Sequence, residues 1–398
     1  MNRFDAGRLG RLRDVMAGHV DQGGVGGVAW LASCGDDLEF GVAGNLTRGQ
    51  PEPVGRDSIF RIASMTKPIV AAGALLLVEE CRLRLDDPVD ALLPELADRK
   101  VLVDGRGPLN GETIPARRPI TVHDVLTFRL GLGMDFEAPW PQPLLEAMDE
   151  LGLGSGPPEP QVPPPPDEWM ARLGTLPLLY QPGARWLYNT GSDVLGVLIA
   201  RAAGQPLEDF LRTRVFDPLG MADTGFSTTH VDRLGSCYRT DPSTGERSVY
   251  DPPMGQWAVP PAFPSGGGGL ISTLDDMHAF GRMLLAGGRL PDGSRLLSRA
   301  TVDAMTTDHI GADQGAAGPS PDGSQGWGFG VAVQVRRTGL GPTVGSYGWA
   351  GGLGSSWGND PSTNLVGVVL TTDMFASAFP PPAVIQDFWT CVHAAVDG

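Results

Sequence analysis

The segment PIVAAGALLLVEECRL, residues 68–83, constrains the fold most, because it is apolar on nearly every side of a helix. A helix of that kind has to be buried, since it has no polar face to present to water. It falls short of the about 18 apolar residues that indicate a membrane span, so other elements must surround it. Pro68 fits only in the first turn of a helix, which is therefore predicted to begin at or just before Ser64.

Ser64 and Lys67 stand three residues apart at this helix start, so their side chains lie on one face. Backbone N–H groups in a first turn have no intrahelical partner, and a free N–H can stabilise an oxyanion. Burial lowers the proton affinity of a lysine amine, whereas arginine stays protonated. Lys67 and Lys100 are the two lysines among 30 basic residues, so the chain otherwise uses arginine for positive charge. A lysine at this position therefore indicates a specific role. The pattern favours a serine nucleophile over a helix-capping serine beside a surface lysine.

Strand patterns occur near both ends of the chain, and short helical patterns fill the middle. The simplest architecture is α+β: one antiparallel sheet flanked by terminal helices, with an all-helical insertion. We expect a discontinuous sheet domain, residues 1–63 plus 266–398, and a mainly helical domain, residues 64–265. A ligand cleft would form where the two meet. The Pro-rich loop at 154–166 is predicted to be a stiff, extended segment, either a surface connector or one wall of that cleft.

Composition excludes several classes of function. A net charge of −16, a pI of about 4.7 and the lack of a basic run argue against nucleic-acid or anionic-membrane partners. The first residues lack the apolar core of a secretory signal, and no membrane span is predicted. The four cysteines form no C-x-x-C pair and the six histidines are scattered. We therefore expect reduced thiols, a cytoplasmic location, and neither a metal nor another cofactor.

With its surrounding blocks, the Ser64–Lys67 motif resembles the serine β-lactamase and penicillin-binding-protein superfamily. The chain is most similar to class C β-lactamases and to family VIII carboxylesterases. The resemblance runs nearly end to end, because several blocks occur in family order: IFRIASMTKPIVAAGALLLVEE, LRLDDPVDALLPEL, ITVHDVLTFRLGL, QPGARWLYNTGSDVLGVLI, GGGGLISTLDDMHAFGRMLLAGG and YGWAGG. It implies a β-lactamase-like fold and an acyl-enzyme formed on the serine.

The second family element, Y-x-N or Y-S-x, falls on Tyr188-Asn189-Thr190. The resemblance implies that Tyr188 is catalytic, because a phenol beside an ammonium can serve as a base for the serine hydroxyl. The alternative is a core tyrosine with a satisfied hydroxyl. Thr190 replaces the asparagine that the family uses in amide recognition, which argues against a lactamase.

The third family element, K-T-G in lactamases and W-x-G in many of the esterases, falls on Trp349-Ala350-Gly351. An aromatic wall in place of a cation suits a neutral ester better than a carboxylate. The resemblance further implies that the backbone N–H of Gly352 pairs with that of Ser64 as the second oxyanion donor. Trp349 could instead be a sheet residue packed on a helix.

Two other patterns look catalytic but are predicted to be structural. GSSWG, residues 354–358, matches the G-x-S-x-G elbow of another hydrolase fold, but a turn and a strand follow Ser356 where that elbow needs a helix. His393, in the terminal helix, is the one downstream histidine available to it. His123 and Asp124 are adjacent on a helix and point apart, so we interpret them as packing and capping residues.

The sequence thus predicts a carboxylesterase that cleaves short-chain or aryl esters with Ser64, Lys67 and Tyr188, and whose partner is a small-molecule ester. The alternatives on the same fold are a β-lactamase, a D-amino-acid amidase or peptidase, and an acyltransferase that uses a thioester donor. A non-catalytic acyl-binding or sensing module is the alternative of another class. The oligomeric state has no signal in the sequence.

Overall fold

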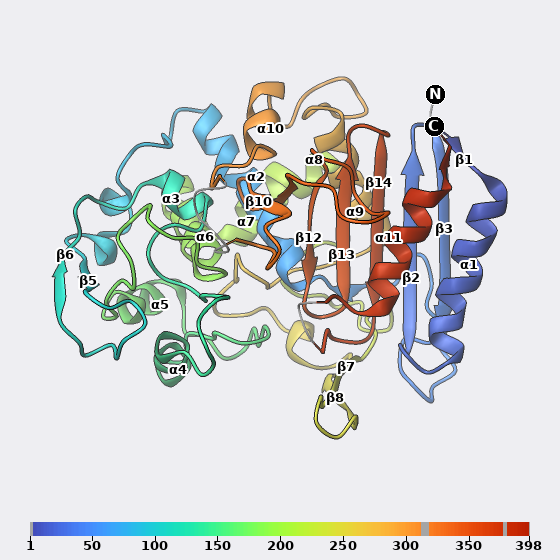
Figure 1. Ribbon diagram of the computed structural model, residues 1–398, viewed down its shortest axis with the longest axis horizontal. Coiled ribbons are helices and arrows are strands. Elements are labelled where there is room, and N and C mark those ends of the chain that lie inside the picture. Colours follow the sequence, from blue (N-terminus) through green and yellow to red (C-terminus); the bar gives the residue numbers. More distant parts are fainter. Residues whose placement is uncertain (1–2, 312–317, 377–379, 398) are drawn as a thin grey trace.

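A seven-stranded antiparallel sheet unites the two ends of the chain (Figure 1). The computed structural model describes residues 3–311, 318–376 and 380–397. In spatial order the strands are β10 (Gln325–Trp327), β11 (Ala332–Gln334), β12 (Tyr347–Gly351), β13 (Ser355–Asp360), β14 (Leu365–Thr371), β2 (Gly27–Cys34) and β3 (Asp37–Gly44). Near the middle of the sheet, Val369 of β14 stands opposite Trp30 of β2.

Alternating residues of the central strands supply two separate cores, one on each face of the sheet. On one face, Trp30 and Val369 pack with residues of α1 (Ala6–Asp21) and α11 (Ala383–Ala395). On the other face, Leu31 and Val368 join the large core that includes α9 (Leu274–Leu285). The chain ends pair as the short strands β1 (Arg3–Phe4) and β15 (Val396–Asp397) beside these helices.

Helices fill the middle of the chain and surround α2 (Thr66–Glu79), in which all but the last two residues are buried. They are α3 (Val122–Leu126), α4 (Pro143–Glu150), α5 (Pro166–Leu173), α6 (Thr190–Ala203), α7 (Leu207–Leu211) and α8 (Asp217–Leu219), with α10 (Arg299–Met305) nearer the sheet. Three small ladders complete the fold: β4 (Phe60–Arg61) with β9 (Ile271–Ser272), β5 (Lys100–Leu102) with β6 (Thr113–Pro115), and β7 (Cys237–Thr240) with β8 (Arg247–Asp251). The α+β architecture expected from the sequence is confirmed, while the proposed domain limits stay a prediction.

Local structure departs from the sequence pattern at two places. The buried helix was predicted to begin at or just before Ser64, but a 3₁₀ turn, Ala63–Met65, comes first and α2 begins at Thr66. The segment GWGFGVAVQV, which has the character of one strand, forms β10 and β11 with a turn between them. Gly330 in that turn has a φ of +73°, and a Cβ there would lie 2.7 Å from the Cβ of Ala71. The hairpin therefore needs a glycine so that it can rest on α2.

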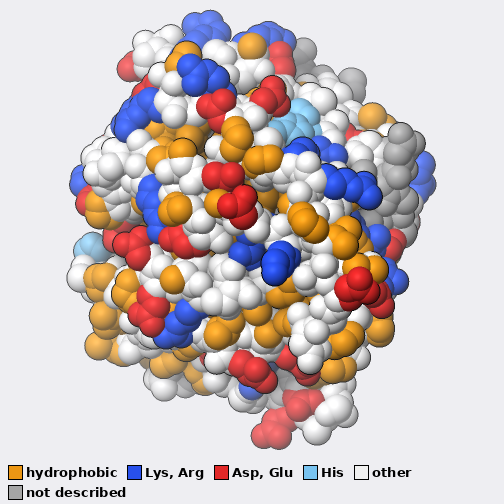
Figure 2. Space-filling view, turned by 90° about the vertical axis from the view of Figure 1, so that its left-hand side faces the viewer, with side chains coloured by type: hydrophobic (Ala, Val, Ile, Leu, Met, Phe, Trp, Pro, Cys, Tyr) orange, Lys and Arg blue, Asp and Glu red, His pale blue; other side chains and the backbone are white. Residues whose placement is uncertain are grey.

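The molecular surface carries charges of both signs. On the face that Figure 2 shows, acidic and basic side chains are interspersed with apolar ones. No helix among the described residues is long and apolar enough to cross a membrane. Within the same residues, no group of three or more His, Cys, Asp or Glu side chains could hold a metal ion.

A buried ion pair anchors the strand that leads to Ser64. Arg61 of β4 is 4% exposed and Asp251 of β8 is 1% exposed, and the Arg61 Nε donates to the Asp251 carboxylate at 2.7 Å. Arg61 also donates to the carbonyl oxygens of Gly235 and Pro252, at 2.6 and 3.0 Å. Because every charge in this contact is paired, the guanidinium can stay buried.

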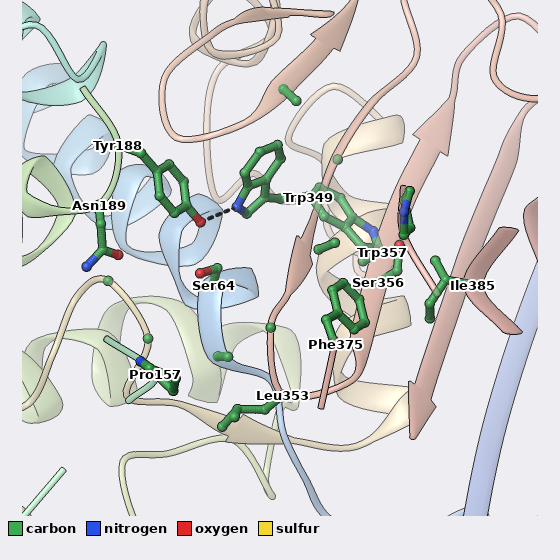
Figure 3. A pocket seen from close by; sticks show the side chains of 18 of the residues that line it. Ser64, Pro157, Tyr188, Asn189, Trp349, Leu353, Ser356, Trp357, Phe375 and Ile385 are labelled. Carbon is green, nitrogen blue, oxygen red and sulfur yellow. Dashed lines mark hydrogen bonds between the residues drawn. The ribbon is translucent and has the colours of Figure 1, made fainter. Parts of the chain in front are cut away.

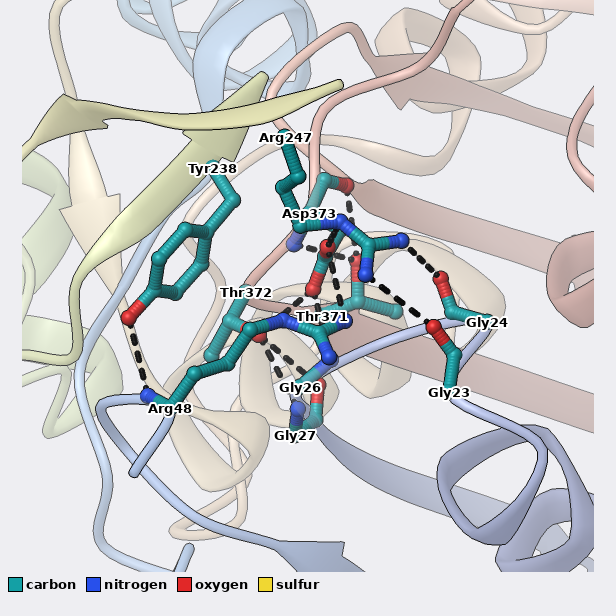
Figure 4. A network of polar contacts seen from close by, with 10 residues as sticks. All are labelled: Gly23, Gly24, Gly26, Gly27, Arg48, Tyr238, Arg247, Thr371, Thr372 and Asp373. Carbon is teal, nitrogen blue, oxygen red and sulfur yellow. Dashed lines mark hydrogen bonds and ion pairs between the residues drawn. The ribbon is translucent and has the colours of Figure 1, made fainter. Parts of the chain in front are cut away.

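A second polar network ties the end of β14 to two distant segments (Figure 4). The Asp373 carboxylate accepts from the backbone N–H of Gly26 at 2.7 Å and forms ion pairs with Arg48 and Arg247, at 3.1 and 3.0 Å. Arg247 belongs to β8, so the network joins the β7–β8 hairpin to the sheet. It also fixes the segment after β14, which runs beside Gly352.

The Arg61–Asp251 pair gives a stability prediction. Asp251→Asn removes the counter-charge of a buried guanidinium and should lower the free energy of unfolding by about 3–5 kcal/mol. The matched control is Asp275→Asn, because Asp275 pairs with Arg56 at the surface, where both side chains are at least 40% exposed. That change should cost about 0–1 kcal/mol. Urea denaturation of the three proteins compares them, and equal losses for the two variants would contradict the assigned role of the buried pair.

Candidate active site

The Ser64 turn is held against the sheet by two close contacts. The Ser355 hydroxyl of β13 donates to the carbonyl of Ile62 at 2.9 Å, two residues before Ser64. Gly351 of β12 lies so close that a Cβ there would be 2.1 Å from the same carbonyl. Ala63, between Ile62 and Ser64, has a φ of +43°, a strained value for a residue with a side chain. The turn that carries Ser64 is therefore held in a fixed position against strands β12 and β13.

The Lys67 amine connects this turn to two other segments. The whole residue is 0% exposed because α2 lies in the core. Its Nζ donates to the Ser64 Oγ at 3.0 Å, to the Asn189 Oδ1 at 2.7 Å and to the Gly267 carbonyl at 2.6 Å. An ammonium group has three N–H donors, and here each one has an acceptor. The structure thus confirms the burial of Lys67 and its approach to Ser64.

Asn189 is a site residue that the motif analysis missed. It has φ +80° and ψ −65°, an unusual conformation for a non-glycine residue, and it immediately precedes α6. Lysine has no hydrogen-bond acceptor, so the carbonyl oxygen of the Asn189 amide must face the Lys67 amine. The sequence offers one indication of this conformation, because asparagine tolerates positive φ better than most residues.

A buried carboxylate supports the third contact of Lys67. Asp193 Oδ1 accepts from the Ser265 hydroxyl at 2.6 Å and from the Gly267 N–H at 3.0 Å. Gly267 in turn presents its carbonyl to Lys67. Burial raises the pKa of the Asp193 carboxyl, although the Lys67 charge and the two hydrogen bonds oppose this effect. Asp193 thereby fixes the 265–267 segment that faces the lysine.

Tyr188 lies at the same site, within an aromatic cluster. The Trp349 indole Nε1 donates to the Tyr188 hydroxyl oxygen at 2.9 Å, which links β12 to the start of α6 (Figure 3). The Lys67 Nζ lies 4.6 Å from the centre of the Tyr188 ring, within the range of a cation–π contact. Phe128 and Trp327 pack around the pair. In Figure 3 the Tyr188 hydroxyl and the Ser64 side chain face the same space.

The two glycines of the third motif have different surroundings. Gly351 makes the close backbone approach to Ile62 described above, whereas a Cβ on Gly352 would meet nothing within 4 Å. Gly352 lines the cavity and accepts a hydrogen bond from the Phe375 N–H at 2.9 Å. Of the two glycines, Gly351 is therefore the one whose position requires the lack of a side chain.

One large cavity of about 1490 Å3 contains the site. Ser64, Tyr188, Asn189, Trp349 and Gly352 all line it. The Pro-rich loop lines it as well, and Figure 3 shows Pro157 below Ser64. Of the two roles considered for this loop, the structure supports a cleft wall. The charged side chains along the cavity are mostly acidic: Asp149, Glu159, Asp193, Asp322 and Asp360, with Arg239 as the basic one among the described residues.

The two patterns predicted to be structural lack the contacts of the Ser64 site, although Ser356 and His393 line the same cavity. Ser356 is inside β13, a turn and β14 follow it, and its hydroxyl accepts from the Trp389 indole at 3.0 Å. The strand–turn–helix elbow is therefore absent there. Asp124 forms a capping box with Thr121 at the start of α3, and the His123 ring packs edge-on against Phe329. The packing and capping roles of His123 and Asp124 are confirmed, whereas the structural role of Ser356 stays a prediction.

Comparisons with known proteins add an independent finding. The chain matches the family model described as Beta-lactamase over residues 12–386. Esterase EstB of Burkholderia gladioli is 33% identical over 380 residues, 90% of this chain and 88% of EstB. Lovastatin esterase of Penicillium rubens is 31% identical over 350 residues, 81% of this chain and 82% of that protein. The solved structure of EstCE1, a hydrolase with promiscuous acyltransferase activity, has a TM-score of 0.79 at 25% identity and covers 97% of this chain and 98% of its own.

The site geometry predicts which serine reacts with an electrophile. A fluorophosphonate probe should label the wild-type protein at Ser64, and Ser64→Ala should abolish labelling. Ser356→Ala is the matched control and should be labelled like the wild type, because the Ser356 hydroxyl accepts from the Trp389 indole, whereas the Ser64 hydroxyl accepts from the Lys67 amine. Intact-protein mass spectrometry with peptide mapping locates the label. Labelling that survives in Ser64→Ala and disappears in Ser356→Ala would reverse the assignment.

Proposed function

The chain belongs to the beta-lactamase family, as its motifs predicted, and we propose that it is a serine carboxylesterase that cleaves short-chain or aryl esters through an acyl-enzyme on Ser64. The main support is the buried Lys67 amine 3.0 Å from the Ser64 hydroxyl, with the Tyr188 phenol in the same cavity. Nucleophilic catalysis needs such an activated hydroxyl. The substrate partner is a small molecule, and a cytoplasmic location without cofactors stays a prediction.

In the proposed mechanism Tyr188 is the general base. All three donors of Lys67 are engaged, so the amine serves to orient the serine and to supply positive charge. The Tyr188 hydroxyl faces the same space as Ser64 (Figure 3), and the Trp349 N–H stabilises negative charge on the phenol oxygen. Ser64 attacks the ester carbonyl as Tyr188 takes its proton. Tyr188 then returns that proton to the departing alcohol and, in the second half-reaction, activates water.

The negative charge of the tetrahedral intermediate needs donors in fixed positions. We assign this role to the backbone N–H groups of Ser64 and Gly352. The Ser355–Ile62 and Phe375–Gly352 hydrogen bonds hold the two segments in place before substrate binds. Each such donor is worth about 3–4 kcal/mol of transition-state stabilisation in comparable sites.

The cavity favours neutral esters over β-lactams. The resemblance puts Trp349 at the position of the lactamase cation, and an indole offers a substrate carboxylate no charged partner there. Thr190, which replaces the amide-binding asparagine, is 2% exposed and does not line the cavity. The names of the relatives EstB and lovastatin esterase likewise describe esterases.

A second candidate function is acyl transfer to an alcohol. It is favoured by the large cavity, which has room for an acceptor next to the acyl group, and by the promiscuous acyltransferase activity in the printed description of EstCE1. A thioester donor with an added alcohol should then give more ester than free acid. A D-amino-acid amidase or peptidase is less well supported, because Thr190 replaces the asparagine that the family uses in amide recognition. A non-catalytic acyl-binding module is less well supported, because the nucleophile, lysine and tyrosine are all present.

The proposed function is tested with two chromogenic substrates. The protein should turn over p-nitrophenyl butyrate and leave nitrocefin almost unchanged. Intact-protein mass should reveal an acyl adduct during ester turnover and its loss after the ester is exhausted. Nitrocefin turnover that equals or exceeds ester turnover would support the lactamase alternative. A stable adduct without product release would support the binding module.

The two lysines of the chain provide a test position, Lys67, and a matched control position, Lys100. Lys67→Arg should lower kcat/KM by at least about 1000-fold, because a bulkier, planar cation cannot make the same three contacts in a fully buried position. Lys100→Arg, at an exposed position on β5, should keep the wild-type value. Ester kinetics measure the effect, and circular dichroism with urea denaturation checks that both variants fold. Wild-type kcat/KM in a folded Lys67→Arg protein would refute the assigned role.

A further inference from the structure

The Pro-rich loop forms a fixed wall beside the nucleophile. We name residues 156–163, GPPEPQVP, the proline strap. All of these residues except Gln161 line the cavity that also contains Ser64. We propose that the proline strap is the specificity element of the esterase, and that it narrows the proposed substrate class to esters with an aryl or other large apolar group, in preference to small aliphatic ones. This inference rests on the proposed function and deepens it.

Two side chains latch the strap to the segment of residues 250–259. The Gln161 Nε2 donates to the carbonyls of Gln256 and Val259, each at 2.9 Å. The Tyr250 hydroxyl, which extends from β8, donates to the Pro158 carbonyl at 2.8 Å. Gln256 belongs to the segment after β8, more than 90 residues along the chain from the strap. The strap therefore crosses from the helical part of the molecule to the β7–β8 region and is fastened there.

The latched strap reaches the immediate neighbourhood of the nucleophile. A Cβ on Gly268 would lie 2.8 Å from the Cγ of Pro158, so the proline ring sits directly on this glycine. The preceding residue, Gly267, presents its carbonyl to Lys67. In Figure 3 Pro157 lies on the same side of the cavity as Leu353, below Ser64. Any substrate group that extends from Ser64 in this direction meets proline rings.

The chemistry of the strap indicates what it binds. Proline has no N–H, so the wall offers apolar ring surface and few donors to a polar substrate. Its φ angle is fixed, and a polyproline segment loses little conformational entropy when a ligand packs on it. Glu159 is its one charged side chain and disfavours an anionic substrate. A flat aryl group or a bulky hydrocarbon gains contact area on such a wall, whereas an acetyl or ethyl group has little apolar surface to bury there.

Removing the side-chain hydrogen bonds of Gln161 and Tyr250 tests this inference and leaves the groups that act on the ester unchanged. The test variants are Gln161→Ala, Tyr250→Phe and the double variant. The controls are Gln205→Ala, at an exposed position after α6, and Tyr180→Phe, which lies outside the cavity. Kinetics are measured with two substrate pairs: p-nitrophenyl acetate against p-nitrophenyl phenylacetate, and ethyl acetate against naphthyl acetate. The first pair varies the acyl group and the second varies the alcohol.

The double variant should raise KM for the larger member of at least one pair by about ten-fold, as expected from the loss of three neutral hydrogen bonds that hold the wall. The smaller members and both controls should stay within about two-fold of wild type. An unchanged ratio between large and small esters, or faster turnover of the large ones, would overturn the strap inference while the esterase function stands. Absence of all ester turnover in the wild type would instead overturn the proposed function.

Discussion

The buried Lys67 amine is the contact on which the site depends. It joins the Ser64 turn, the Asn189 residue that precedes α6 and the Gly267 segment, which are far apart in the sequence. A buried ammonium is costly unless every N–H finds an acceptor, so these three segments are constrained together. Asp193 contributes indirectly, because it accepts a hydrogen bond from the Gly267 N–H and so fixes the backbone that faces Lys67. The geometry around Ser64 is thus a property of the folded core rather than of one loop.

The sheet supplies the other half of the site because its strands come from both ends of the chain. β12 and β13 approach the Ser64 turn through Gly351 and Ser355, and the β10–β11 turn rests on α2 through Gly330. The two glycines allow the backbone to approach closely and the Ser355 hydroxyl adds a hydrogen bond, so the segments have little freedom for relative motion. The aromatic link between Trp349 and Tyr188 then spans the gap between sheet and helices. A site built this way is preorganised before a ligand enters.

Much of this arrangement could be predicted from the sequence, because its signals are local. Ser64, Lys67 and Pro68 share one helix start, and Tyr188 and Trp349 stand in family blocks with recognisable neighbours. Asn189 was missed because its role arises from a rare backbone conformation and a contact 122 residues along the chain. The composition of residues 154–166 predicted a stiff loop. Which surface the loop lines depends on the hydrogen bonds of Gln161 and Tyr250, and these join segments that no local sequence pattern connects.

The pairing of β1 with β15 has a practical consequence, because it brings the described ends of the chain together, with Arg3 opposite Asp397. Figure 1 shows both ends at the edge of the molecule, on the far side of β2 and β14 from the helical part. A short linker could join them, and new ends could be opened in the exposed turn between β7 and β8. Circular permutants of this chain, or fusions made near the described ends, would add chain at this edge of the molecule, away from the helical part.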